Sequence, residues 1–143
     1  MLSTAESCTG GFLSKVITDI PGSSAWFERG FIVYSEQAKC ELLGVQPATL
    51  TQFGAVSQET VQEMAQGALK HSHAQVSVAI TGIAGPSGAT PSKPLGLVWL
   101  AWASQAWPLK TSVYQFVGDR EAVRTQSVKA ALTGLEALLR QQI

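Results

Sequence analysis

The spacing of apolar residues along the chain changes between a helical period and a strand-like period. Apolar residues after Thr9, such as Leu13, Val16 and Ile17, recur at helical spacing as far as the turn at Pro21-Gly22. The same criterion, with Ser35, Ser57 and Asp119 as caps, predicts helices over residues 9–20, 36–43 and 47–53, after Ser57, and from Asp119 to the end of the chain.

Runs of β-branched and aromatic residues predict strands over residues 30–34, 75–81, 95–103 and 109–117. The run 75–81 has only small residues between its branched ones, so we expect it to be buried on both faces of a sheet. A hairpin-length loop separates the last two runs, which indicates at least one antiparallel pairing. The alternation of strands and helices predicts an α/β fold with a mixed, mostly parallel sheet and helices on both faces.

Composition narrows the class of protein. At 143 residues the chain suits one domain, residues 1–143, with a substantial core. Ten basic residues balance ten acidic ones without a run of either sign, so we expect a small-molecule partner, no nucleic acid and no membrane. The longest apolar run, residues 95–103, is too short to span a bilayer, which needs about 20 residues.

The cysteines and tryptophans add two expectations. Cys8 and Cys40 have no metal-ligand or CxxC spacing and no secretory context, so we expect reduced thiols and a cytoplasmic protein. The four tryptophans carry more apolar area than one small core can readily absorb. We therefore expect a homodimer or a higher homo-oligomer.

The most reactive-looking stretch is Thr4–Gly11, where a strand gives way to a helix. It combines two possible nucleophiles, Ser7 and Cys8, with the pair Gly10-Gly11. The first turn of the following helix would offer free N–H groups and a positive dipole end to an oxyanion or a phosphate. The alternative is that Ser7 and Thr9 only cap that helix.

Other candidate residues follow predicted strands. Tyr34 and Lys39 are near neighbours, Thr81 ends the buried strand, and a loop rich in glycine and proline runs over residues 82–94. In α/β sheets ligands bind at the carboxyl ends of strands, so these segments can meet at one edge. The alternatives are an exposed lysine, a tyrosine packed on the core and a loop that only connects two strands. Arg120 and Arg124, four apart, could hold a phosphate or line a solvated helix face.

Five motifs together resemble the CinA C-terminal domain family over nearly the whole chain, in order and with family-like spacing. They are Thr4–Gly11, Tyr34-Ser35-x-x-Ala38-Lys39, Gly54-Ala55-Val56-Ser57, Thr81-Gly82-Ile83-Ala84-Gly85-Pro86 and Gly118–Arg124. The resemblance implies a three-layer α/β/α domain that hydrolyses the carboxamide of nicotinamide mononucleotide to nicotinate mononucleotide and ammonia, a step of pyridine nucleotide recycling, without a metal or cofactor. Family domains usually have a helix and a full first strand before Thr4, and we expect that such an upstream element is missing here.

The resemblance also implies residue roles. Ser7 would be the nucleophile, with Lys39 and Tyr34 beside it as the other catalytic residues. A lysine can act as a base only when neutral, which burial favours by lowering its pKa. The substrate would be bound by Thr9, Gly10, Gly11, Thr81, Gly82, Ala84, Gly85, Arg120 and Arg124. Two alternatives stay open: Cys8 as the nucleophile, and a non-catalytic nucleotide-binding or assembly module of the competence- and damage-inducible type.

Overall fold

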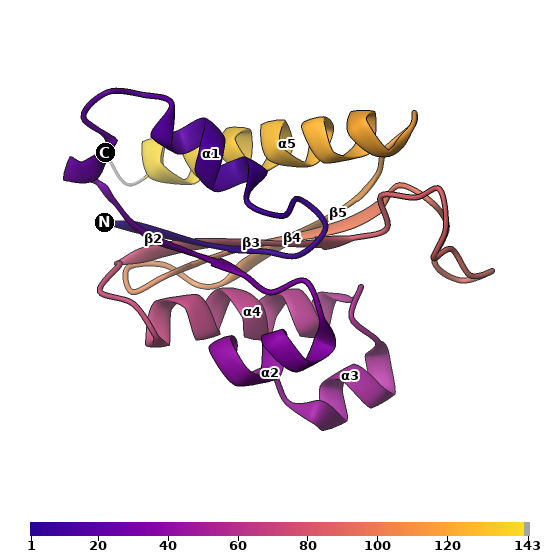
Figure 1. Ribbon diagram of the computed structural model, residues 1–143. Coiled ribbons are helices and arrows are strands. Elements are labelled where there is room, and N and C mark those ends of the chain that lie inside the picture. The colour runs from indigo at the N-terminus through magenta and orange to yellow at the C-terminus, as the bar shows by residue number, and fades with distance from the viewer. Residues whose placement is uncertain (142–143) are drawn as a thin grey trace.

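A computed structural model describes residues 1–141 and shows a five-stranded mixed sheet between two layers of helices (Figure 1). The strands β1 (Leu2–Glu6), β2 (Phe27–Ile32) and β3 (Val76–Gly82) are parallel to one another, β4 (Leu97–Ser104) is antiparallel to β3, and β5 (Lys110–Gln115) is antiparallel to β4. The order in the sheet is β2-β1-β3-β4-β5. The helices are α1 (Phe12–Thr18), α2 (Glu36–Leu43), α3 (Pro47–Phe53), α4 (Gln58–Lys70) and α5 (Arg120–Arg140). The expected three-layer α/β/α fold with a mixed sheet is confirmed.

Each face of the sheet has its own apolar core. Helices α1 and α5 cover one face, and α2, α3 and α4 cover the other (Figure 1). Val78, Leu100 and Trp102 belong to the core under α1 and α5, while Ala79 and Ala101 belong to the core under α4. Alternate residues of β3 thus serve opposite cores, and the expectation that this strand is buried on both faces is confirmed.

The first helix starts later than the sequence predicts. It begins at Phe12 rather than near Thr9, because the residues between the end of β1 at Glu6 and Phe12 form a turn. Gly10 and Gly11 have φ values of 57° and 102°, a left-handed backbone that side-chain-bearing residues rarely adopt. The pair of glycines therefore builds a turn between strand and helix, and Ser7 lies at the start of that turn.

The second strand lies earlier than predicted, at 27–32 instead of 30–34. It is an edge strand paired with β1 alone, and its polar residues, the half-buried Glu28 and the exposed Arg29, hid it from a search for apolar runs. Gly30 is required there, because a Cβ atom would lie 2.6 Å from Ser14 Oγ and 2.8 Å from Thr4 Oγ1. The shift leaves residues 33–35 in the loop that leads into α2.

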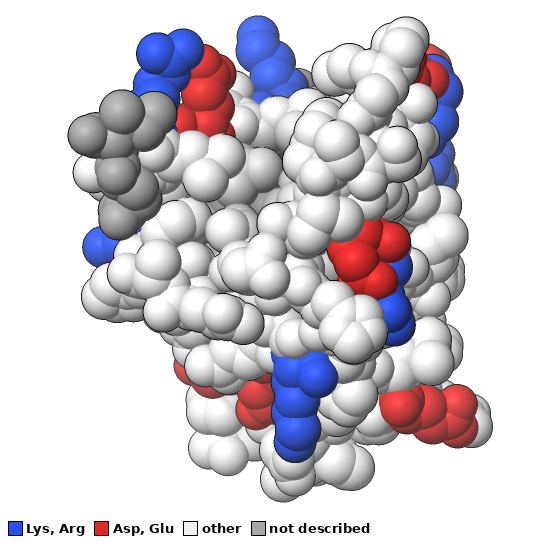
Figure 2. All heavy atoms as spheres, turned by 90° about the vertical axis from the view of Figure 1, so that its left-hand side faces the viewer, with Lys and Arg blue, Asp and Glu red and all other residues white. Residues whose placement is uncertain are grey.

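The surface charges and the tryptophans bear on the expected partners. On the end opposite the carboxyl ends of β1 to β3, acidic and basic side chains are scattered among uncharged ones without a large patch of one sign (Figure 2). Trp102 is buried and donates from Nε1 to Ala131 O at 3.0 Å, whereas Trp26 stays 39% exposed. None of the helices within residues 1–141 is long and apolar enough to cross a membrane. The homo-oligomer stays a prediction.

Candidate functional site

A buried lysine contacts a serine at the carboxyl end of β1. Lys39 Nζ lies 2.9 Å from Ser7 Oγ, and only 1% of Lys39 and 8% of Ser7 are exposed. The serine follows the last residue of β1, and the lysine lies on α2, whose N-cap Ser35 accepts from Ala38 N–H. The topology therefore joins two side chains that are 32 residues apart in the sequence.

The surroundings of the Lys39 amine favour its neutral form. Burial lowers the pKa of Lys39 from its ordinary value, and the nearby Cys8, Glu36 and Cys40 only partly oppose that shift. Among the ion pairs found within residues 1–141, none includes Lys39. Its amine instead donates to two backbone carbonyls, Val33 O at 2.9 Å and Tyr34 O at 3.2 Å.

A neutral Lys39 amine can make all three of these contacts. A neutral amine has two N–H donors and one lone pair, and the carbonyls of Val33 and Tyr34 can take both donors. The third neighbour, Ser7 Oγ, then faces the lone pair and can donate its proton to it. The arrangement can therefore activate the Ser7 hydroxyl as a nucleophile.

The start of α1 does not hold a ligand, because Glu6 occupies it. The two carboxylate oxygens of this fully buried side chain accept from Leu13 N–H at 2.8 Å and Ser14 N–H at 3.0 Å. Phe12 N–H, the remaining donor of that turn, bonds to Thr9 O. The N–H groups of residues 12–14 are therefore not free for an oxyanion or a phosphate, since the acidic side chain at the end of β1 already complements the dipole. The expected binding point is left to the N–H groups of the turn before Phe12.

Cys8 points to the other side of the sheet from Ser7. It is 6% exposed and belongs to the apolar core under α1 and α5, whereas Ser7 faces α2. Burial raises the pKa of Cys8 to about 11, so its thiol is protonated near neutral pH. A protonated thiol in an apolar core is a weak nucleophile, and the geometry favours Ser7 over Cys8.

We expect the Cys8→Ala variant to keep its hydrolytic rate within several-fold of the wild type. The substitution removes one buried sulfur from the core without touching the contact between Ser7 and Lys39. Ammonia release at saturating substrate measures the effect, with Cys40→Ala as the matched control on α2. A loss as large as that of a Ser7 variant would make Cys8 the nucleophile.

The Tyr34 side chain lies away from the lysine. Its backbone carbonyl accepts from the Lys39 amine, but the phenol is 62% exposed and its hydroxyl accepts from Arg120 Nη2 at 3.2 Å. Sequence reasoning expected the hydroxyl itself beside the amine, where it could relay a proton. In the structure the backbone carbonyl of Tyr34, and not its hydroxyl, contacts the Lys39 amine, because β2 ends at Ile32 and the loop turns the ring outward.

The two arginines near the start of α5 have different neighbours. Arg120 is exposed and donates from Nη1 to Gly85 O at 2.8 Å as well as to Tyr34. The half-buried Arg124 donates from Nε to Cys8 O and from Nη2 to Thr9 O, each at 3.1 Å. The two residues lie on the same helix, but only Arg120 reaches the glycine loop.

The lysine and the serine open into a cavity of about 310 Å³. Thr81, Gly82, Ala84 and Gly85 line it as expected, together with Ser7, Cys8, Tyr34, Lys39, Ala55, Val56, Ile83, Ser87, Gly88 and Arg120. Thr9, Gly10 and Gly11 do not line this cavity and instead shape the turn behind it. Within residues 1–141, no group of three or more His, Cys, Asp or Glu side chains is placed to hold a metal ion.

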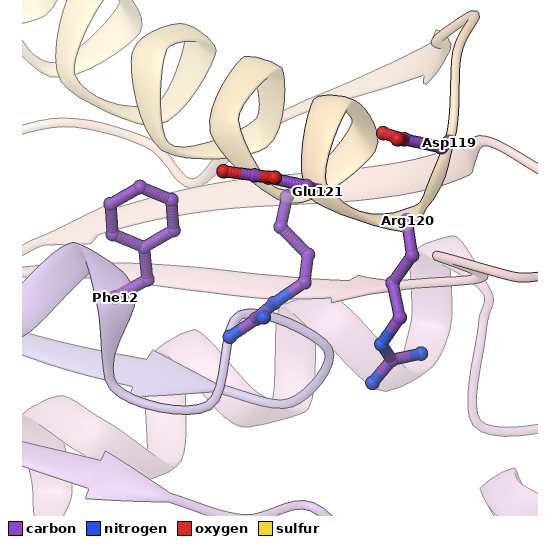
Figure 3. Close-up of a pocket in the computed structure, with 5 residues that line it drawn as sticks. Phe12, Asp119, Arg120 and Glu121 are labelled. Carbon is purple, nitrogen blue, oxygen red and sulfur yellow. The ribbon is translucent and has the colours of Figure 1, made fainter.

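A second cavity of about 490 Å³ adjoins the first and shares Arg120 with it. Figure 3 shows Phe12 of α1 facing the first turn of α5 across this space, with Asp119 and Glu121 on the helix and Arg120 extending away from it. It is the larger cavity and is also lined by Arg124, but no serine, cysteine or lysine lines it. The chemistry therefore belongs to the smaller cavity, and the larger one offers room for the rest of a substrate.

Two parts of the site were not found by sequence reasoning. Glu6 was read as part of a reactive stretch, although an acidic residue shortly before a helix is a known signal for its N-terminus. The sequence marks Gly54-Ala55 as part of a motif but does not show that this segment supports the wall of the cavity. Its carbonyls accept from three buried hydroxyls, namely Ser57 Oγ, Thr60 Oγ1 and Thr81 Oγ1. Thr81 thus holds the wall of the cavity through its hydroxyl.

Comparison with known proteins confirms the resemblance over almost the whole chain. The family model described as the CinA C-terminal domain matches residues 1–139. A protein of Enterobacter agglomerans named nicotinamide-nucleotide amidohydrolase PncC is 53% identical over 99% of this chain and 85% of its own length. The protein of that name from Escherichia coli strain K12 is 54% identical over 94% of this chain and 81% of its own length.

A solved structure agrees with the fold. The crystal structure of the competence/damage inducible protein CihA from Agrobacterium tumefaciens superimposes with a TM-score of 0.95 at 47% identity. The match covers 96% of this chain and 84% of that one. Sequence and structure comparisons therefore point to the same group of proteins.

Proposed function

The chain belongs to the CinA C-terminal domain family, and from that membership we propose that it hydrolyses the carboxamide of nicotinamide mononucleotide, with Ser7 as the nucleophile and Lys39 as the base. The products are nicotinate mononucleotide and ammonia. Relatives at 53% and 54% identity carry the name nicotinamide-nucleotide amidohydrolase, which supports this reaction. The observation that carries the residue roles is the 2.9 Å contact between a buried amine and a serine hydroxyl.

The reaction begins with a proton transfer to Lys39. The neutral amine takes the Ser7 proton as Oγ attacks the carboxamide carbon, which gives a tetrahedral intermediate. The C–N bond then breaks, and the protonated amine returns its proton to the departing ammonia. Water next attacks the acyl-serine, the amine acting again as the base, and Ser7 is released with nicotinate mononucleotide.

The oxyanion of the tetrahedral intermediate needs donors close to Ser7. Because Glu6 binds the first N–H groups of α1 and Gly10 N–H bonds to Ser7 O, we assign the oxyanion to the other backbone N–H groups of the turn 8–11, those of Cys8, Thr9 and Gly11. The residue after a nucleophilic serine supplies such a donor in other serine hydrolases. Removal of one oxyanion donor typically lowers the rate by about 10²–10³-fold.

The two adjoining cavities suit the two ends of the substrate. With the carboxamide at Ser7, the walls formed by Thr81, Gly82, Ala84 and Gly85 would enclose the pyridine ring. Arg120 lies where the two cavities meet and has an exposed guanidinium, so it is our candidate for the phosphate. We also keep the prediction of a cytoplasmic protein, where the two free thiols would stay reduced.

The purified chain should release ammonia from nicotinamide mononucleotide, and kcat/KM should rise with pH through the pKa of Lys39. The sign follows from the need for a neutral base: below that pKa the amine is protonated and inactive, and above it the rate levels off. Since burial lowers this pKa, the plateau should begin below the ordinary range of lysine.

Calorimetry on the same samples distinguishes the alternative role. Tight binding of the mononucleotide with no ammonia at any pH would identify a non-catalytic nucleotide-binding module. A rate that is flat from acid to alkaline pH would instead leave the hydrolysis in place and remove Lys39 as the base.

A further inference from the structure

The turn that carries Ser7 is attached to α5 by one arginine. Arg124 Nε donates to Cys8 O and Arg124 Nη2 donates to Thr9 O, each at 3.1 Å. These contacts join residues 116 and 115 positions apart in the sequence. A planar guanidinium that binds two adjacent carbonyls fixes their relative direction, which a lysine cannot do with its single point charge.

The other hydrogen bonds of the turn do not replace this link. Ser7 N–H bonds to Ile80 O on β3, and Gly10 N–H bonds back to Ser7 O. Thr9 O also receives Phe12 N–H, so it keeps a donor without Arg124. The carbonyl of Cys8, next to the nucleophile, has Arg124 Nε as its donor.

The helix that presents Arg124 is firmly held. Val123, the residue before it, is 1% exposed in the core, and Trp102 Nε1 on β4 donates to Ala131 O two turns further along α5. The ion pairs within residues 1–141 do not include Arg124, so its guanidinium is directed at the turn and not at a carboxylate. A rigid helix therefore sets the position of the turn.

Peptide geometry carries the effect from Arg124 to the reaction. In a planar trans peptide the carbonyl and the following N–H point in opposite directions. When the carbonyls of Cys8 and Thr9 are held toward α5, the N–H groups of Thr9 and Gly10 are held away from it. The guanidinium thus fixes both the backbone next to Ser7 and the direction of N–H groups in the turn.

We propose that Arg124 is a positioning residue that holds the nucleophile turn, and with it the Ser7 hydroxyl, in register with the Lys39 amine. The role differs from phosphate binding, which is the other use of an arginine at this place. The catalytic part of this proposal rests on the proposed function, whereas the hydrogen bonds of Arg124 are contacts in the structure.

We expect Arg124→Ala to lower kcat by about 10²-fold with little change in KM, since a displacement near 1 Å at a reacting atom can cost about that much. Nicotinamide riboside, which lacks the phosphate, should lose the same factor as the mononucleotide. Methylguanidinium should restore part of the rate to Arg124→Ala and none to Ser7→Ala. Arg140→Ala, on the same helix in an exposed pair with Glu136, is the matched control and should behave as the wild type.

Several outcomes would overturn the proposal. A normal kcat in Arg124→Ala would do so, and so would a rise in KM confined to the phosphorylated substrate, which would make Arg124 a phosphate ligand. If the alanine variant does not fold, Arg124→Lys keeps the charge and the stem but not the two-carbonyl contact, and its kcat should fall by about tenfold. An unchanged kcat in Arg124→Lys would count against the proposal.

A readout without turnover separates this inference from the proposed function. Amide hydrogen exchange in the turn 8–12 should be faster in Arg124→Ala, or in Arg124→Lys, than in Arg140→Ala. Equal exchange would show that Arg124 does not hold the turn, whether or not the chain is an enzyme. Absence of ammonia release by the wild type would refute the hydrolysis, and the exchange rates would still decide the role of Arg124.

Discussion

Replacing Ser7 by alanine should reduce ammonia release from nicotinamide mononucleotide by about 10⁴-fold or more, because the variant has no atom to form the acyl intermediate. The fold should survive, since Ser7 is small and its N–H bond to Ile80 O is made by the backbone. Circular dichroism and thermal unfolding would check the fold, and a coupled ammonia assay would check the rate. Substrate binding should persist within a few-fold.

The control for this variant is Ser24→Ala. Ser24 lies on the surface and does not line the cavity. This control should keep the full rate. Wild-type turnover in Ser7→Ala would remove Ser7 from the mechanism and leave the 2.9 Å contact with Lys39 without a catalytic meaning.

Replacing Lys39 by methionine should have an effect as large as the loss of Ser7. Methionine fills the space of the lysine stem but cannot accept a proton, so the hydroxyl stays inactive. Residues that act as one unit are non-additive, and the double variant Ser7→Ala/Lys39→Met should be no slower than either single one. Steady-state rates of the three variants test this directly.

The stability of the Lys39 variant should change little. The carbonyls of Val33 and Tyr34 would lose a donor, at a cost of about 1–3 kcal/mol each, while the burial of a polar amine would be relieved. These effects oppose each other. The matched control is Lys15→Met, which should keep its rate. Lys15 lies exposed on α1 and pairs with Asp19. Substantial turnover in Lys39→Met would rule out the amine as the base.

The elements of the fold could be read from the sequence because their signals are local. Ser35, Ser57 and Asp119 were read as caps, and each accepts an N–H three residues further along. The central strand 76–82 was close to its predicted bounds, since β-branched residues and burial agree there. The edge strand β2 was misplaced because Glu28 and Arg29 interrupt its apolar residues, and no periodic pattern marks a strand of that kind.

The candidate site was predictable in its residues but not in its contacts. The ends of predicted strands mark Ser7 and Thr81, the family resemblance marks Lys39, and the structure brings all three to one cavity. The direction of a side chain depends on neighbours from other parts of the chain. That is why the Tyr34 phenol turned out to bond to Arg120, and why Arg124 was expected at a phosphate but contacts the nucleophile turn.

The sequence by itself determined the layers of the fold, the family and the segments that meet at one edge of the sheet, because periodicity, caps and turn residues act over a few positions. Only the tertiary structure decided which groups touch. It put the Lys39 amine out of water against two carbonyls and Ser7, and it closed the start of α1 with Glu6. Burial and long-range contacts set the protonation state of an amine and the direction of a hydroxyl. They are properties of the packed chain and cannot be read from local spacing.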